Sequence, residues 1–130
     1  MAVLACLLIH VCCGSPTFAA DKGKLREMLV GRWQCQLEYG SWTIERKVDG
    51  TFVKRGRLVR TLGHSPEDFS VKGRWQIEGK KYIEVWDQVS PSSWSEVKGT
   101  TRRAEVLLLE PNRFKRIQSD APVFLETRVG

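Results

Sequence analysis

The chain has 130 residues, of which 42% are hydrophobic and 28% charged, and its formal net charge is +6 at pH 7. This length is enough for one domain with a substantial core but not for two. The composition excludes a disordered chain.

The first twenty residues contain no Lys, Arg, Asp or Glu. An apolar run leads to the small residues Ala19 and Ala20, and the charged Asp21 follows at once. This pattern is typical of a secretory signal peptide, so we expect cleavage after Ala19 or Ala20. Residues 1–20 are then the signal peptide, and residues 21–130 form one exported domain, periplasmic or secreted. The apolar run is too short to span a bilayer, so we expect no transmembrane segment after cleavage.

The cysteines leave one alternative open. Cys12 and Cys13 follow the apolar run, so a lipid anchor at either is a second interpretation. We rank it lower because Val11 is bulkier than lipid-attachment sites usually tolerate. Signal cleavage leaves Cys35 alone, which makes no internal disulfide, and we expect it to be a small buried hydrophobic residue.

The excess of 21 basic over 15 acidic residues falls entirely after residue 20. The basic residues are scattered singly or in pairs such as Lys54-Arg55 and Lys115-Arg116, which indicates a solvated basic surface. A sharper alternative is weak attraction to anionic envelope polymers or lipid head groups. Nucleic acid is a poor partner for an exported protein, so we expect none.

Residues 21–30 are expected to form a short helix, with Leu25, Met28 and Leu29 at helical spacing. Residues 31–39 then alternate between apolar and polar side chains, and residues 73–78 repeat the pattern. Such period-two alternation predicts strands with one face on a core and the other in water.

Turns are predicted at Gly40-Ser41 and Asp49-Gly50. The second is a strong hairpin signal, because both central residues of a type I′ turn need positive φ. A two-residue loop there would place Glu45 opposite Lys54, a pair of opposite charges. Gly56 lies inside a predicted strand and is expected to mark a bulge.

In the second half of the chain we expect a loop at residues 61–69, a turn at residues 90–93 and a strand that begins at Trp94. Residues 106–109 are apolar on both faces, so we expect both faces to be covered, one of them by the N-terminal helix. Further strands are expected at residues 42–48, 51–60, 70–78, 81–89, 103–109, 113–118 and 123–129. Eight or nine short strands without a βαβ crossover predict an all-β meander, which closes into a barrel or splits into a sandwich.

Four segments carry a resemblance to a known family: the apolar turn of residues 25–30, Gly31-x-Trp33, Asp49-Gly50-Thr51-Phe52, and Gly73-x-Trp75-x-Ile77. With them the chain resembles the lipocalin-like (calycin) barrels, and most closely the small exported lipocalin-like domain proteins of bacteria. It lacks the disulfide and the Thr-Asp-Tyr motif of full-size lipocalins.

The resemblance implies an up-and-down antiparallel β-barrel of about eight strands, with a short N-terminal helix plugging one end. It also implies that Gly31 and Trp33 close that end of the barrel. The tryptophan would lie under an arginine from a late strand, either Arg128 or Arg116.

The sequence offers little catalytic chemistry. His64 is the only histidine after residue 20, and no nucleophile elbow, phosphate-binding glycine loop or metal-ligand spacing is present. Among the carboxylates, Glu84 and Asp87 are the best of a poor set, and neither has an evident inward partner. We therefore expect no enzymatic activity, no cofactor and no metal.

Aromatic and apolar side chains at inward positions are the feature that stands above background. Candidate ligand-binding residues are Trp33, Tyr39, Phe52, Trp75, Ile77 and Trp86. The simpler interpretation is that they fill the barrel, since lining and filling give the same period-two pattern. The predicted function is an exported non-catalytic barrel that binds a small apolar or amphiphilic ligand. The alternative is an envelope protein-interaction module, such as a protease inhibitor or structural protein, that acts through its surface and loops.

Overall fold

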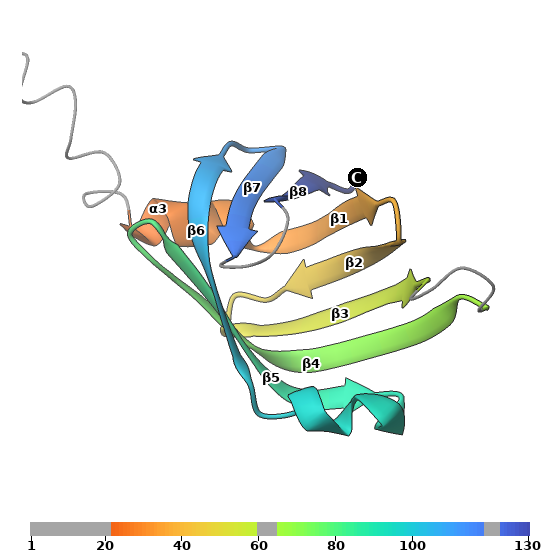
Figure 1. Cartoon of the computed structure of the whole chain (residues 1–130). Coiled ribbons are helices and arrows are strands. Elements are labelled where there is room, and N and C mark those ends of the chain that lie inside the picture. Colours follow the sequence, from red (N-terminus) through yellow and green to blue (C-terminus); the bar gives the residue numbers. More distant parts are fainter. Residues whose placement is uncertain (1–21, 60–64, 119–122) are drawn as a thin grey trace, which may run out of the picture.

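The structure is a computed structural model that describes residues 22–59, 65–118 and 123–130. Eight antiparallel strands follow one another in chain order and close into a barrel (Figure 1). This confirms the predicted all-β, up-and-down barrel. The elements are α3 (Lys22–Leu29), β1 (Gly31–Leu37), β2 (Gly40–Arg46), β3 (Thr51–Leu58), β4 (Glu67–Glu78), β5 (Lys81–Ser90), the 3-10 helix η1 (Ser92–Val97), β6 (Thr101–Leu109), β7 (Arg113–Gln118) and β8 (Val123–Arg128).

Some of the earlier predictions fall wholly or partly on residues outside this description, among them the predicted loop of residues 61–69, of which residues 61–64 are not described. The predicted signal peptide, residues 1–20, and the single later histidine, His64, both lie outside the described residues.

The barrel closes where the last strand meets the first. Trp33 pairs with Arg128 and Cys35 with Glu126 across the β1–β8 ladder. Trp33 and Cys35 are buried while Gln34 between them is exposed, as the period-two alternation predicts.

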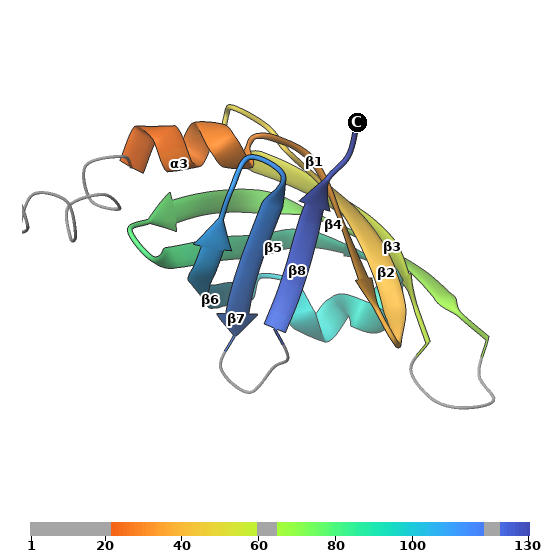
Figure 2. The same cartoon turned by 90° about the horizontal axis from the view of Figure 1, so that it is seen from above.

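The N-terminal helix α3 lies at one end of the barrel, beside β4, in both views (Figures 1 and 2). Arg26 attaches the helix to the loop between β2 and β3, because its Nη2 donates to the carbonyl oxygen of Val48 at 2.9 Å. At the start of β1, the Trp33 indole Nε1 donates to the Leu29 carbonyl oxygen at 3.0 Å. The side chains of Leu25 and Leu29 are buried. An eight-residue helix is marginal alone, so this packing on the barrel stabilises it.

Arg128 completes the closure at this end. Its guanidinium carbon lies 4.4 Å from the centre of the Trp33 ring. Its Nη1 donates to the Val30 carbonyl oxygen at 3.1 Å, and its Nη2 donates to that of Met28. The space beside Gly31 is taken by this arginine, since a Cβ there would lie 2.6 Å from Nη1 of Arg128.

Two hairpin predictions in the first half were wrong in register. The first turn lies at Glu38 and Tyr39, so Gly40 already belongs to β2. The Asp49-Gly50 loop has three residues, 48–50, because the amide of Lys47 donates to the carbonyl oxygen of Thr51 at 2.8 Å. Glu45 therefore pairs with Val53, and Lys54 pairs with Ile44 and points into the barrel. Gly50 has φ of 91°, the positive value expected of it.

Gly56 does not mark a bulge, because both of its ladders run without interruption. The residue is glycine because a Cβ there would lie 2.2 Å from the carbonyl oxygen of Ser41. The register shifts fall elsewhere, between Lys72 and Gly73 on β4 and between Val106 and Leu108 on β6.

Three predictions in the second half are corrected. Strand β4 begins at Glu67, inside the predicted loop of residues 61–69. Trp94 does not open a strand but lies in η1, and its side chain is buried there. The run 106–109 is not covered on both faces, because Leu107 is 48% exposed. Hydropathy alone cannot separate an exposed apolar side chain from a covered one.

The half of the barrel next to α3 is packed with side chains. Trp33 and Phe114 meet edge to face with centroids 6.5 Å apart, and Tyr82 meets Phe114 in the same way at 5.2 Å. Trp75 is buried here, and its Nε1 donates to the Lys47 carbonyl oxygen at 3.1 Å. For this half, the interpretation that aromatic residues fill the barrel agrees with the structure.

We predict that Trp33→Ala destabilises the protein by about 3–5 kcal/mol, because it removes a fully buried aromatic side chain. Trp75→Ala should destabilise it to a similar degree, since Trp75 also packs in this half. The measurement is the free energy of unfolding from urea denaturation. Val48→Ala is the control, because Val48 is 76% exposed and surface substitutions have small effects. An unchanged midpoint for Trp33→Ala would contradict the packing described.

Candidate functional site

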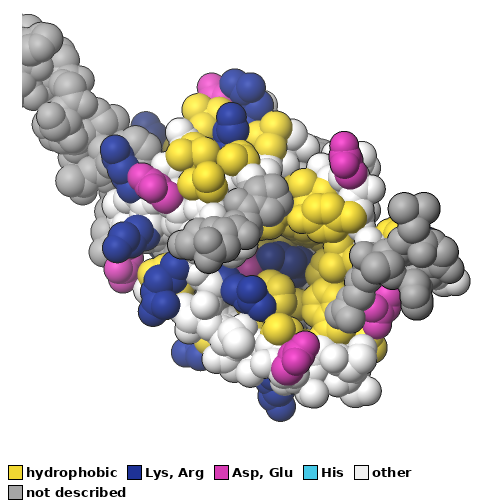
Figure 3. Space-filling model, in the orientation of Figure 1, with side chains coloured by type: hydrophobic (Ala, Val, Ile, Leu, Met, Phe, Trp, Pro, Cys, Tyr) yellow, Lys and Arg dark blue, Asp and Glu magenta, His cyan; other side chains and the backbone are white. Residues whose placement is uncertain are grey.

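The end of the barrel away from α3 is hollow. A cavity of about 200 Å³ lies there, which we call the interior cavity. Figure 3 looks into a hollow with hydrophobic side chains around its rim and Lys or Arg atoms at its bottom. The lining residues are Tyr39, Trp42, Lys54, Leu58, Phe69, Glu84, Trp86, Trp94, Arg102, Arg116, Gln118 and Phe124.

The apolar walls come from strand ends and from η1. Leu58 ends β3, while Phe69 lies near the start of β4. Trp94 of η1 stacks on Phe69 with ring centroids 4.8 Å apart. Trp42 of β2 meets Phe124 of β8 edge to face at 5.2 Å. These contacts hold the walls in place and leave the space between them open.

Three buried charged side chains, Lys54, Glu84 and Arg116, line the cavity and form its floor. Arg46 and Glu126 are also buried and bond to this group from outside the lining. We call the five residues the ion network. Glu126 accepts from Arg46 Nη2 at 2.7 Å through Oε1 and from Arg116 Nη1 at 2.8 Å through Oε2. Trp42 Nε1 reaches the same Oε2 at 3.5 Å. Glu126 therefore links β2, β7 and β8 through the interior of the barrel.

Glu84 holds the other side of the ion network. Its Oε1 accepts from Lys54 Nζ at 2.8 Å and from Trp86 Nε1 at 3.0 Å. Its Oε2 accepts from the Tyr82 hydroxyl at 2.6 Å. The Tyr82 hydroxyl oxygen in turn accepts from Arg46 Nε at 2.8 Å, so the two halves of the network are joined.

The pKa values follow from burial and from these partners. Burial raises the pKa of Glu126, but Arg116 and Arg46 outweigh burial and bring it down to about 2. In the same way, Lys54 and Arg116 hold the pKa of Glu84 well below its ordinary value. Burial lowers the pKa of Lys54, and Glu84 offsets only part of that effect. Both carboxylates are therefore ionised at neutral pH.

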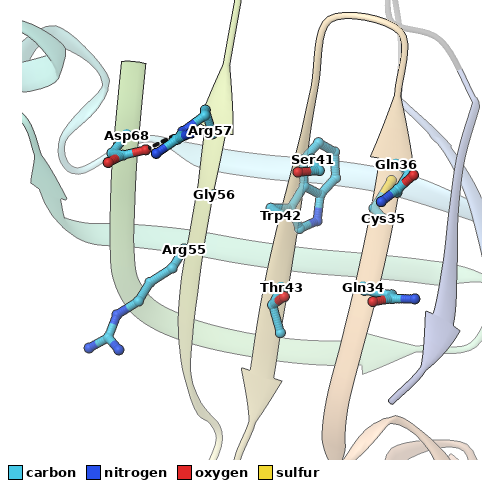
Figure 4. Close-up of a pocket in the computed structure, with 10 residues that line it drawn as sticks. All are labelled: Gln34, Cys35, Gln36, Ser41, Trp42, Thr43, Arg55, Gly56, Arg57 and Asp68. Carbon is cyan, nitrogen blue, oxygen red and sulfur yellow. Dashed lines mark hydrogen bonds and ion pairs between the residues drawn. The ribbon is translucent and has the colours of Figure 1, made fainter. Parts of the chain in front are cut away.

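The outer face of the sheet carries shallower and more polar hollows. One of about 210 Å³ lies over β1–β4 and is shown in Figure 4. There Arg57 pairs with Asp68 at 2.7 Å, with both side chains mostly exposed, while Arg55 extends away from them. An exposed ion pair contributes little, and this surface lacks the buried, prearranged groups of the interior cavity.

The predicted ligand-binding residues separate into two groups. Tyr39 and Trp86 line the interior cavity. Trp33, Phe52, Trp75 and Ile77 are buried in the core and are not among the lining residues. The proposed closure residues, Gly31, Trp33 and Arg128, come together at the α3 end.

The sequence-based prediction missed the charged floor. Glu84 was taken to have no inward partner, yet it lies on the same inward face of β5 as Tyr82 and is 2% exposed. The sequence did indicate that Glu84 points inward, because Tyr82, Glu84 and Trp86 alternate with outward residues, as they do along one face of a strand. This alternation does not reveal that Lys54, on the distant strand β3, is the partner of Glu84.

The described residues offer little else for chemistry. They contain no cluster of three or more His, Cys, Asp or Glu side chains able to hold a metal ion. Cys35 is buried, and burial raises its pKa to about 11, so its thiol is a poor nucleophile. None of the helices in the described ranges has the length and apolar character needed to cross a membrane.

The fold is a closed up-and-down barrel with a helix at one end and a cavity at the other, the architecture that the resemblance to the lipocalin-like barrels implies. No family model matches the chain, and no curated protein matches it either. The structure is similar to a lipocalin-like protein from Bacteroides uniformis ATCC 8492, with 12% identity, a TM-score of 0.48, and coverage of 78% of this chain and 99% of that one. It is also similar to an uncharacterized protein from Bacteroides eggerthii DSM 20697, with 13% identity, a TM-score of 0.47, and coverage of 77% and 98%. At these identities the likeness concerns the fold alone.

We predict that stability falls as the pH is lowered from about 5 towards 2. The folded-state pKa of Glu126 is about 2 and its ordinary value is 4.5. The contribution of Glu126 to the free energy of unfolding is therefore fully present above its ordinary pKa. That contribution is lost as the pH falls to its folded-state pKa. Urea denaturation at a series of pH values measures this loss.

Two variants identify its source. Glu126→Gln should reduce the pH dependence in this window, and the remainder comes from Glu84, whose pKa is also held low by its partners. Asp68→Asn should leave most of the dependence, because Asp68 pairs only at the surface. An unaltered pH profile in Glu126→Gln would argue against the assignment to the ion network.

Proposed function

We propose that the protein is an exported, non-catalytic lipocalin-like barrel that binds a small apolar or amphiphilic molecule in its interior cavity. The observation that carries the proposal is a cavity with aromatic walls above a floor of buried polar groups. Small-molecule sites are mostly apolar hollows with a few fixed polar groups of this kind.

The size of the cavity limits the ligand. At about 200 Å³ it is smaller than the roughly 300–1,000 Å³ of sites for drug-sized molecules. We therefore expect a medium-length alkyl chain or a system of two or three small rings. A polar end would meet Lys54, Glu84 or Arg116, and the apolar part would contact Trp42, Phe69 and Phe124, all of which line the space.

Export is a part of the proposal that rests on sequence. Residues 1–20 carry no charged side chain and end in small residues, as a cleavable signal does. We expect the mature protein to begin at Ala20 or Asp21. N-terminal sequencing of the protein recovered outside the cytoplasm checks this. A mature terminus at a lipidated Cys12 or Cys13, or an intact Met1, would overturn it.

A second candidate function has its own observation. Leu107, Ile117, Val123 and Leu125 are exposed on the outer faces of β6–β8, and Ile117 pairs with Val123 across the β7–β8 ladder. Exposed apolar side chains that lie together favour a protein-interaction role. This alternative needs no open cavity, so ligand binding discriminates between the two functions.

We expect N-phenyl-1-naphthylamine, a neutral dye that fluoresces in apolar surroundings, to bind the wild-type protein, and 1-octanol to displace it. Tyr39→Ala should weaken dye binding by roughly fivefold, because it removes one aromatic wall of the cavity. Tyr39 is 44% exposed, so the fold should tolerate the change.

The matched control is Val48→Ala. Val48 lies in the β2–β3 loop beside α3, at the other end of the barrel, and its truncation should leave dye binding unchanged. A wild-type protein that binds neither dye nor octanol would remove the small-molecule proposal and leave the interaction role.

A further inference from the structure

The outer face of strands β1–β4 carries a polar surface that the interior cavity does not explain. Two hollows form it, one of about 210 Å³ and one of about 650 Å³. They are continuous, because Gln34, Thr43 and Arg55 line both of them. We call this surface the outer groove. The other charged side chains that line it are Arg32, Glu45, Lys47, Arg57, Asp68 and Lys72.

The strand register arranges the outer groove in rows that cross the sheet. In each row, residues that lie opposite one another on neighbouring strands run from β1 to β4. Neighbouring strands lie about 4.8 Å apart, so a row over four strands is about 15 Å long. An extended ligand can therefore follow a row and contact several strands. One row is Gln34, Thr43, Arg55 and Ser70, and the next is Arg32, Glu45, Val53 and Lys72.

The carboxylates of the outer groove are already paired. Glu45 lies 3.6 Å from Arg32, and Asp68 lies 2.7 Å from Arg57. All four side chains are at least 45% exposed, so water screens both pairs. Among the described residues no other carboxylate lines either hollow. Any further cation of the groove is thus left without a negative partner in it.

Three such cations are present. Lys47, Arg55 and Lys72 are exposed and form no ion pair or side-chain hydrogen bond with another described residue. Figure 4 shows the Arg55 side chain extending away from the nearby ion pair. Arg55 and Lys72 are diagonal neighbours on β3 and β4, with backbones about 7–8 Å apart. Like charges at this separation repel, and an anion held between them relieves the repulsion.

Neutral hydrogen-bonding groups lie beside these cations. Gln34 and Thr43 are exposed in the same row as Arg55, and Gln36 pairs with Ser41 one step further along the strands. Amide and hydroxyl side chains can both donate and accept hydrogen bonds. A ligand that satisfies the whole groove therefore has separated negative charges with hydroxyl groups between them.

We propose that the outer groove binds a linear polysaccharide whose sugars carry carboxylate groups. Arg55 and Lys72 bind carboxylates, for which a guanidinium supplies a planar fork of donors. Gln34 and Thr43 bond the sugar hydroxyls between the charges. The inference goes beyond the proposed cavity function and does not depend on it, because the groove lies on the outside of the barrel.

The composition of the groove disfavours other anionic partners. Proteins that bind single-stranded nucleic acid stack the bases on aromatic side chains. Among the described residues that line the groove, Trp42 is the sole aromatic one, and it is buried. A protein that lies on a lipid surface inserts apolar side chains into it, whereas the exposed side chains here are polar or charged.

The test measures the binding of a fluorescently labelled oligogalacturonate by fluorescence anisotropy at low salt. Wild-type protein should bind it, and added salt should weaken the binding. The fully methyl-esterified oligosaccharide keeps hydroxyl groups but lacks the charges, so it should bind at least about tenfold more weakly. Polyglutamate of similar length has carboxylates without sugar hydroxyls and should also bind more weakly than the oligogalacturonate.

Two variants remove unpaired cations. Arg55→Gln and Lys72→Gln should each weaken oligogalacturonate binding about two- to fivefold, the usual effect of one exposed charge. Lys115→Gln is the matched control, because Lys115 is exposed on β7 and lines neither hollow. It changes net charge equally and should keep wild-type affinity. All three positions are exposed, so the fold should tolerate the changes.

Two further variants test the arrangement of the groove. Glu45→Gln removes the carboxylate that pairs with Arg32, so binding should become about twofold tighter. Thr43→Val removes a hydroxyl group and keeps the branched shape and the net charge. It should reduce the preference for oligogalacturonate over polyglutamate about threefold and leave the salt dependence unchanged.

Four outcomes would overturn the inference. An equal loss in Lys115→Gln and Arg55→Gln would assign the binding to net charge and not to the groove. A methyl ester that binds as well as the acid would remove the carboxylate preference. Polyglutamate or single-stranded DNA that binds as tightly as the oligogalacturonate would remove the polysaccharide. Absence of oligogalacturonate binding at low salt would remove the site, while the dye experiment on the interior cavity would stand unaffected.

Discussion

The interior of this barrel depends on the carboxylate of Glu126. This side chain is fully buried on β8 and accepts charged donors from β2 and β7. Removing one member of such a network leaves its partners charged in a low-dielectric interior, which costs about 3–5 kcal/mol. Replacing all members with apolar side chains often costs much less. The five residues therefore act as a set, and single substitutions within it are the expensive ones.

The position of this set explains why the barrel is half solid and half hollow. Towards α3, the buried rings of Trp33 and Tyr82 both pack against Phe114. Towards the other end, side chains stop at the walls and leave the cavity. Between them lies a polar layer that cannot be covered by apolar atoms without losing hydrogen bonds. The cavity at this end has polar groups at its floor and apolar side chains in its walls. Such a cavity suits a molecule with one polar and one apolar part.

The barrel could be predicted from the sequence because the period-two alternation of a strand is a local pattern and the turns lie close to glycine and proline residues. Strand register and side-chain partners were predicted less well, because they depend on pairing between segments far apart in the sequence. The register of the Asp49-Gly50 hairpin differs by one residue, which moves Lys54 from the surface partner Glu45 to the interior partner Glu84. Trp94 was expected to open a strand, yet it lies in a short helix and stacks on Phe69.

The site was only partly predictable for the same reason. Aromatic residues were identified as inward, but an alternating strand does not show whether its inward side chains meet others or face open space. Tyr39 and Trp86 line the cavity, whereas Trp75 packs in the core. Arg102, which lines the cavity, carried no signal, because one of two adjacent arginines in a basic sequence is usually solvated.

The joining of β1 to β8 has a consequence for how the chain folds. Arg128 bonds the carbonyl oxygens of Val30 and Met28 across separations of 98 and 100 residues. No growing chain can make this closure until its last strand has emerged, and contacts so distant in sequence slow folding. Until then β1 presents an unpaired edge, and Arg46 and Arg116 lack Glu126. The incomplete chain is thus held back from its final shape by its own topology.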